Sequence, residues 1–203
     1  METAATSPRT EPSLRIATDI LQRLDFPALF GRSAPVEVEL GAGDGSFLLG
    51  HAAAHPGRDF VGVERLLGRL RKIDRKGRRR GLANLRALRL EAAYVLEWMI
   101  PAASLHALHV YFPDPWPKRR HWKRRLVNTR FVELAAKALA PGGTVYVRTD
   151  DPSYFEQMTE VFDAGALFER VEEPAGLLDL KTDFESEFNA RGIATRHAAW
   201  RLR

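Results

Sequence analysis

The fold is decided at residues 36–47, where the chain reads VEVELGAGDGSF. The apolar run at 36–40 is typical of a short buried strand. The three glycines that follow let the backbone turn tightly and come close to a ligand. Residues 46–55 are apolar and rich in alanine and end before a proline, which predicts a helix. A strand, a glycine loop and a helix in this order indicate the opening unit of an α/β sheet.

Segments typical of strands and helices alternate along the rest of the chain. Further strands are expected at 59–64, 84–90, 105–112 and 144–150. Helices are expected at 14–24, 66–80, 93–99, 128–139 (ended by PGG at 141–143) and 152–162. A final antiparallel pair is expected from 168–171 and 193–202. This alternation predicts an α/β fold with a doubly wound, mostly parallel sheet and an antiparallel last strand, in one domain over 14–203 after a flexible arm at 1–13.

Composition excludes several classes of protein. The 203 residues are 45% hydrophobic and 28% charged, as in soluble globular proteins, and no stretch has 18 uncharged apolar residues. The N-terminal METAATSPRTEP lacks the apolar core of a secretory signal. The chain has no cysteine, which excludes disulfides, cysteine-rich zinc sites and a thiolate nucleophile. These features predict a cytoplasmic protein.

Charge is distributed unevenly. Residues 65–80 hold nine Lys/Arg and one acid, whereas residues 163–187 hold eight acids and two bases. A second basic block spans 118–125. Two such blocks predict a nucleic-acid partner. The alternative is that each block is only the solvated face of a helix.

Acidic residues around the glycine loop indicate the ligand. A dinucleotide fingerprint of the form G-x-G-x-x-G would need glycine at position 46, which is Ser46. Glu64, 23 residues after Gly41, is placed to accept hydrogen bonds from ribose hydroxyls. Glu39 would repel a pyrophosphate but suits a cationic sulfonium that carries an amino acid group. S-adenosylmethionine fits both acids; the alternative is a tight turn with solvated acids.

The second unusual stretch, residues 112–125, reads FPDPWPKRRHWKRR. Residues before proline avoid the helical region, so Phe112 and Asp114 are expected to be extended and the turn stiff. Trp116 offers a flat face to a base, and the cations after it can hold phosphates. The alternative is a proline-rich loop with an N-capping aspartate. Since ligands bind at the carboxyl ends of parallel strands, one rim should collect the loops at 41–46, 64–66, 91–93, 112–118 and 149–152.

Five motifs together resemble the bacterial tRNA (guanine-N(7)-)-methyltransferase family, TrmB. They are ELGAGDG, GVE, FPDPWPKRRHWKRR, TD at 149–150 and TDFESEFNARG at 182–192. The resemblance runs from about residue 35 to the C-terminus, and its proline–tryptophan motif is highly specific. It implies a Rossmann-like class I methyltransferase that uses S-adenosylmethionine and acts on a guanine of the tRNA variable loop, position 46 in the tRNA convention.

The resemblance also implies roles for individual residues. Cofactor contacts are expected from the glycine loop and four acids: Glu39, Gly41, Gly43, Glu64, Glu91 and Asp114. Substrate contacts are expected from Lys118, Asp150, Thr182, Asp183, Phe184 and Glu185. RNA contacts are expected from Arg119, Arg120, His121, Lys123, Arg124 and Arg125. Asp114 is the expected catalytic residue.

Two departures from the family pattern affect this assignment. Glu91 stands where an aspartate is usual, and LLDLK precedes TDFE without the Arg-Pro of some members. The spacing of Thr182 and Glu185 also fits a helix capping box.

Guanine N(7) carries a lone pair and no proton, so its methylation needs alignment of the reactants and negative potential rather than a general base. The base must be displayed in a loop or drawn out of its stack. Two other functions stay open: an RNA-binding module without turnover, and a nucleic-acid methyltransferase acting on an exocyclic amine. The sequence leaves monomer and homodimer open.

Overall fold

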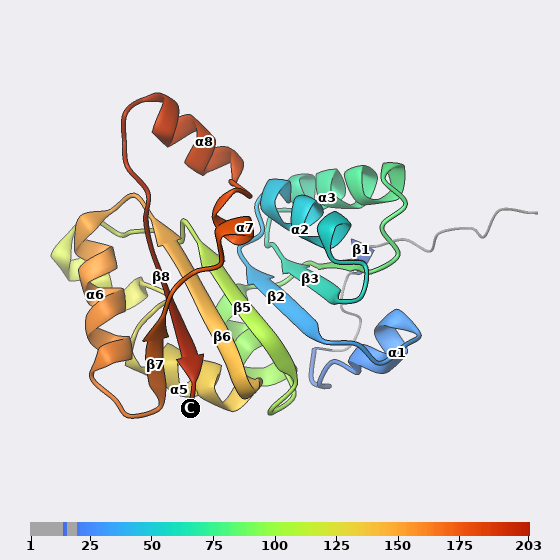
Figure 1. The fold of residues 1–203 in the computed structure, drawn as a ribbon, viewed down its shortest axis with the longest axis horizontal. Coiled ribbons are helices and arrows are strands. Elements are labelled where there is room, and N and C mark those ends of the chain that lie inside the picture. The colour runs from blue at the N-terminus through green and yellow to red at the C-terminus, as the bar shows by residue number, and fades with distance from the viewer. Residues whose placement is uncertain (1–13, 16–19) are drawn as a thin grey trace, which may run out of the picture.

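The computed structural model describes residues 14–15 and 20–203, and a single mixed sheet runs through it (Figure 1). Its strands are β1 (Leu14–Arg15), β2 (Val36–Leu40), β3 (Asp59–Val63), β4 (Leu85–Leu88), β5 (Leu105–Tyr111), β6 (Leu139–Thr149), β7 (Phe168–Val171) and β8 (Arg196–Leu202). Their order is β1-β4-β3-β2-β5-β6-β8-β7. Neighbours are parallel except β8, which is antiparallel to β6 and β7. The predicted sheet is therefore confirmed.

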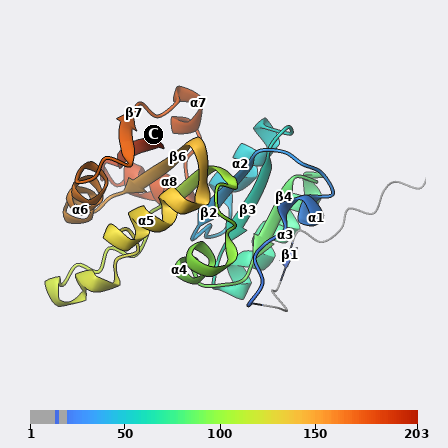
Figure 2. The ribbon, with the colours of Figure 1, turned by 90° about the horizontal axis from the view of Figure 1, so that it is seen from below.

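Helices cover both faces of this sheet; Figure 2 shows α2 and α7 on one face and α4 and α5 on the other. They are α1 (Phe26–Phe30), α2 (Ser46–Ala54), α3 (Leu67–Arg79), α4 (Ala92–Tyr94), a π-helix η1 (Val95–Met99), a 3₁₀ helix η2 (Arg119–Arg124), α5 (Thr129–Ala138), α6 (Pro152–Asp163), α7 (Ala175–Leu178) and α8 (Asp183–Ala190). One apolar core joins the sheet to α5 and α6, and another joins it to α2 and α3. Within the described residues, no helix has both the length and the apolar character to cross a membrane.

Two glycines let helices approach the sheet closely around the glycine loop. A Cβ on Gly62 in β3 would lie 2.5 Å from Leu48 Cδ2 of α2. A Cβ on Gly45 would lie 2.8 Å from Ile73 Cγ1 of α3, and Gly45 also has a φ of +81°. The loop is therefore packed against α3 as well as joined to α2.

Two predictions about elements are wrong. The helix predicted for 14–24 is not there in the part that is described: β1 pairs with β4, and 20–24 has no helix, with Leu21 86% exposed. Residues 16–19 and the predicted arm at 1–13 lie outside the described residues. The PGG stretch falls within β6 instead of separating helix from strand, because Leu139 already pairs with Leu105; it forms an irregularity there, since Gly142 has a φ of +76° and pairing resumes with Thr144 opposite Ala107.

Candidate active site

A cleft of about 580 Å³ opens where β2, β3, β4 and β5 end. Its wall comes mainly from five segments, at 39–46, 63–66, 90–92, 111–116 and 182–184. Four of the five loops predicted for this rim therefore meet there. The fifth, at 149–152, contributes no residue to the wall.

The glycine loop and Glu64 form one built unit of this wall. Gly41 and Gly43 have φ values of +83° and +57°, a region that favours glycine. Gly43 N donates to Glu64 Oε2 at 3.0 Å, and Leu66 N donates to Glu64 Oε1 at 2.7 Å. Each carboxylate oxygen keeps a second lone pair for a ligand. Glu64 is thus oriented by backbone amides and can still accept hydroxyl hydrogen bonds.

Glu39, at the end of β2, lies in the floor of the cleft. It is buried, and its Oε2 has no hydrogen-bond partner among the described residues. Burial raises its pKa to about 8, an effect that Arg148 opposes and Asp44 and Glu64 reinforce. A buried carboxylate without a partner is stabilised by a cation, so this position suits a positively charged ligand group.

Glu91 is already engaged by the protein. Its Oε2 accepts a hydrogen bond from Tyr94 N at 2.9 Å and so caps α4, while the residue lines the cleft. An N-cap fixes the side chain at the rim. The structure therefore brings Glu91 to the predicted place, with one oxygen used for the cap.

The turn after β5 is strained. Phe112 and Trp116 both precede prolines and have φ values of +49° and +47°, which are rare for bulky residues and cost on the order of 1–3 kcal/mol each. The extended conformation expected for Phe112 is therefore wrong. Phe112 N still donates to Arg148 O at 2.8 Å, so the chain must turn away from β6 at this residue. Asp114 lines the cleft, and its carboxylate makes no hydrogen bond or ion pair with a described residue.

Arg125 holds this turn from inside the protein. Its side chain is fully buried and donates from Nε to Pro115 O at 2.8 Å and from Nη2 to Ser153 Oγ at 2.7 Å. The guanidinium also lies over the rings of Trp122 and Tyr154. The RNA contact expected from Arg125 is therefore not supported by its position, because the guanidinium is buried and engaged inside the protein.

The other members of the basic block, apart from Lys118, lie on η2 itself. Arg119, Arg120, Lys123 and Arg124 are exposed, and His121 is half-buried. Arg124 also lines the cleft, with Cζ 4.9 Å from the ring centroid of Trp116. Trp116 thus sits in the cleft wall beside an available cation.

The TDFE stretch forms the opposite lip. Thr182 Oγ1 accepts from Glu185 N at 3.0 Å and caps α8, and Asp183 N donates to Ser46 Oγ at 2.9 Å. A hydrogen bond with the Asp44 carboxylate raises the pKa of Asp183. Thr182, Asp183 and the exposed Phe184 line the cleft. These contacts join the start of α8 to the glycine loop.

Glu185 is directed away from the cleft. It is buried, and Oε2 accepts from Arg148 Nη1 at 3.1 Å, whereas the predicted capping box would return it to its own helix end. Arg148 is fully buried, also pairs with Glu173, and donates to the carbonyls of Leu177 and Leu180. The substrate contact expected from Glu185 is therefore not supported by its position. Arg148 was not identified from the sequence as a structural residue. The available signal was a single arginine within the otherwise apolar strand sequence TVYVRT, which indicates a buried charge that needs partners.

Comparison with known proteins agrees with this geometry. A family model described as a putative methyltransferase matches residues 33–202. The tRNA (guanine-N(7)-)-methyltransferase of Sodalis glossinidius is 40% identical over 182 residues, covering 89% of this chain and 76% of that protein. The chain belongs to this methyltransferase family. The enzyme of the same name from Leifsonia xyli is 43% identical over 180 residues, covering 88% and 79% of the two chains.

Solved structures share the methyltransferase fold at lower identity. The 16S rRNA methyltransferase KamB superposes with a TM-score of 0.65 at 19% identity, covering 87% of this chain and 92% of that one. TrmN from Thermus thermophilus superposes with a TM-score of 0.60 at 17% identity, covering 87% of this chain and 47% of that one.

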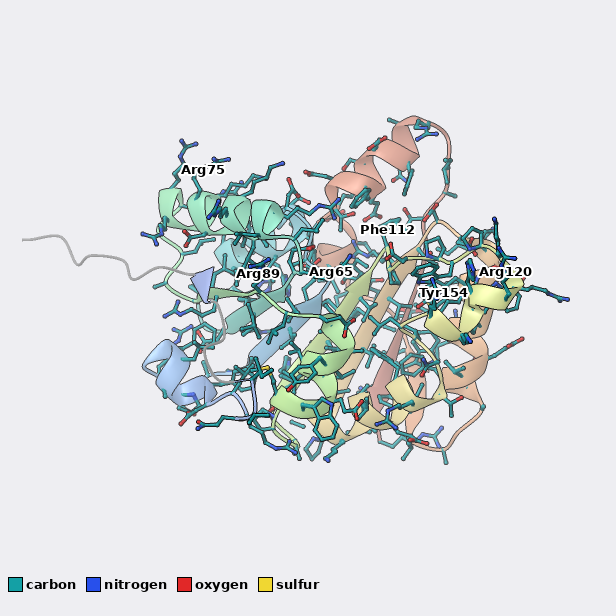
Figure 3. The ribbon with its side chains drawn as sticks, turned by 180° about the vertical axis from the view of Figure 1, so that it is seen from behind. Arg65, Arg75, Arg89, Phe112, Arg120 and Tyr154 are labelled. Carbon is teal, nitrogen blue, oxygen red and sulfur yellow. The ribbon has the colours of Figure 1, made fainter. Side chains whose placement is uncertain are left out.

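Two residues that were expected to contact the substrate, Lys118 and Asp150, lie outside the cleft wall. Lys118 is exposed at the start of η2, and Asp150 is half-buried after β6. Figure 3 shows how the basic elements flank the cleft: Arg65 and Arg75 lie on the α3 side and Arg120 on the other, with Phe112 between them. Arg65 itself lines the cleft. A substrate larger than the cleft would meet cations on both sides.

Proposed function

We propose that this chain transfers a methyl group from S-adenosylmethionine to N(7) of a guanine in tRNA, at position 46 of the variable loop. The observation that carries the proposal is the place of Asp114. The strained turn brings this carboxylate to the same cleft as the glycine loop, Glu39 and Glu64. The names of the relatives and the two basic elements beside the cleft support tRNA as the substrate.

The residues present fit this cofactor. Glu39 offers a buried oxygen that has no partner among residues 14–15 and 20–203 and suits a cationic group, and Glu64 offers lone pairs to hydroxyls. A Cβ on Gly41 or Gly43 would meet no atom of the described part of the chain within 4 Å, so the loop leaves open space along the cleft. When bound, S-adenosylmethionine supplies an electrophilic methyl group on a sulfonium. Glu39, Glu64 and the glycine loop would hold it, with Glu91 at the rim.

Asp114 acts on the other reactant. Guanine N(7) has no proton to lose, so this carboxylate serves by position and charge and removes no proton. It can accept hydrogen bonds from the guanine edge and can stabilise the positive charge that grows on the purine. Trp116, in the same wall, can stack on the displaced base. The strain at Phe112 and Trp116 is consistent with a turn held in place for function.

The basic elements hold the RNA around the cleft. Exposed cations on η2 and α3 can neutralise phosphates on both sides of the displaced guanine. Arg124 lies over the ring of Trp116, so it suits a phosphate close to the methylated base.

The test is incubation with methyl-labelled cofactor and an unmodified tRNA transcript, followed by nucleoside mass spectrometry. We expect 7-methylguanosine from the transcript and none from a matched transcript with adenine at position 46. Label on an exocyclic amine would favour the alternative methyltransferase chemistry. Cofactor and tRNA binding without any labelled nucleoside would favour a binding module and contradict the proposal.

A further inference from the structure

Three polar side chains meet in the protein interior, at a place separate from the cleft. They are Glu37 of β2, His51 of α2 and His109 of β5, which are 1%, 5% and 1% exposed. Glu37 Oε2 lies 2.8 Å from His51 Nε2 and 2.9 Å from His109 Nε2. One donor atom from each residue falls within 4.8 Å of the other two. None of the three lines the cleft.

We propose that Glu37, His51 and His109 form a binding site for a divalent transition-metal ion of the zinc type. Imidazole nitrogen and carboxylate oxygen are ligands that zinc takes, and two histidines with one glutamate is a known ligand set. At bond lengths of about 2.0–2.1 Å, tetrahedral donors lie roughly 3.3 Å apart. The two short separations in the cluster would need to widen by only about half an ångström.

Outer contacts orient these donors. His109 Nδ1 lies 2.9 Å from Tyr111 Oη, and Arg58 Nη1 donates to Glu37 Oε1 at 2.6 Å. Such partners fix the ring and the carboxylate of metal ligands. With an ion on both Nε2 atoms, each neutral imidazole carries its proton on Nδ1, and Tyr111 Oη can accept that of His109. The positive charge of Arg58 lowers the affinity of the site for a cation. Arg58 donates to Glu37 Oε1, however, so Oε2, which faces both histidines, stays available to the ion.

The cluster is reachable. All three residues line a second cavity of about 370 Å³, which also touches His55, His106 and Tyr146. This cavity gives an ion a route and leaves room for a fourth ligand. His51 Nδ1 is buried with no hydrogen-bond partner in the described part of the chain, so the cluster is not fully satisfied by protein alone. A bound ion would tie α2, which starts at the glycine loop, to β2 and β5.

The test uses tag-free protein treated with chelator and then titrated with zinc or cobalt(II) chloride alone. We expect one ion per chain and the visible absorption of a tetrahedral cobalt(II) complex. His51→Gln and His109→Gln keep an amide that can reach Glu37, and should weaken ion binding at least about 100-fold, more than loss of an outer partner. His106→Gln is the matched control, because this exposed histidine lines the same cavity outside the cluster; its affinity should be unchanged.

Far-UV circular dichroism checks that each variant is folded. Wild-type protein that binds no stoichiometric ion would overturn the proposal, as would full binding in both folded variants. The cluster would then be a hydrogen-bonded link between α2 and the sheet. If neither variant folds, the cobalt spectrum of wild type decides, since the absence of tetrahedral bands would equally overturn it. None of these outcomes depends on methyl transfer.

Discussion

The two walls of the cleft are held by different means. On the glycine-loop side, Glu64 is oriented by the backbone amides of Gly43, from the loop between β2 and α2, and of Leu66, from the loop between β3 and α3. On the other side, buried arginines hold the turn and α8: Arg125 reaches Pro115 and Ser153, and Arg148 reaches Glu185 across 37 residues. The first wall is held by backbone amides of two consecutive strand–loop–helix units, and the second by hydrogen bonds from buried arginine side chains that reach as far as 37 residues along the chain. Changes on the second wall should therefore disturb the molecule more.

The largest effect is expected at Asp114. Asp114→Asn keeps the shape and one acceptor but removes the charge, so kcat should fall by roughly two to three orders of magnitude, the scale of a lost preorganised contact. Asp114→Ala should be worse. Single-turnover rates at saturating cofactor and tRNA measure this.

tRNA affinity is the control for Asp114 and should change little in either variant, since an exposed carboxylate does not hold phosphates. A rate near that of wild type for Asp114→Ala would show that the turn only supports other residues.

Arg125 and Arg124 make a matched pair on the second wall. Arg125→Ala removes charged hydrogen bonds to Pro115 and Ser153 in the interior, so the free energy of unfolding should fall by about 3 kcal/mol. Arg124→Ala, at an exposed position, should cost less than about 1 kcal/mol of stability but weaken tRNA binding. Urea unfolding measures the stability of each variant, and tRNA titration measures its affinity for the substrate. Equal stability of both variants would show that Arg125 does not hold the turn.

This pair also marks how far sequence reasoning reaches. The strand–glycine loop–helix unit and its acids were predictable, because spacing along the chain determines a local unit. Arg125 looked like one more member of a basic block, and its burial depends on Ser153 and Tyr154, which come from a distant helix. The burial of Glu185 depends on Arg148 in the same way. Long-range partners leave no periodic signal, so the second wall could be located but not assigned residue by residue.

On the first wall, Glu64→Ala should weaken S-adenosylmethionine binding by about 1.5–3 kcal/mol, as for hydrogen bonds to a charged group. The side chain also anchors Gly43 N and Leu66 N, so circular dichroism and thermal unfolding must accompany the calorimetry. Unchanged affinity in a folded variant would remove Glu64 from the cofactor site.

Glu39 should make stability depend on pH. Its pKa is raised by burial from 4.5 to about 8, so the folded protein keeps a proton that the unfolded chain releases in this range. Stability should therefore fall as pH rises from about 4.5 to 8, by at most about 1.4 kcal/mol per unit, and level off above. Glu39→Gln lacks this titration, so its stability relative to wild type should rise by about 2 kcal/mol between pH 6 and 8. Parallel curves for the two proteins would contradict the buried-acid assignment.

The smallest effects should come from single cations outside the walls, and they decide whether tRNA spans both sides of the cleft. Lys123 on η2 and Arg75 on α3 are exposed, and neither makes a hydrogen bond or ion pair with another described residue. If each meets one phosphate, Lys123→Ala and Arg75→Ala should each reduce the slope of log affinity against log salt by about 1. Lys137→Ala is the control: it is exposed near the start of β5, at the end of the sheet opposite the cleft, and should leave the slope unchanged. A lower slope for Lys123→Ala alone would indicate that tRNA contacts only the side of the cleft that carries the second wall. An affinity independent of salt would mean that neither basic element binds phosphate, because release of counterions accompanies every such contact.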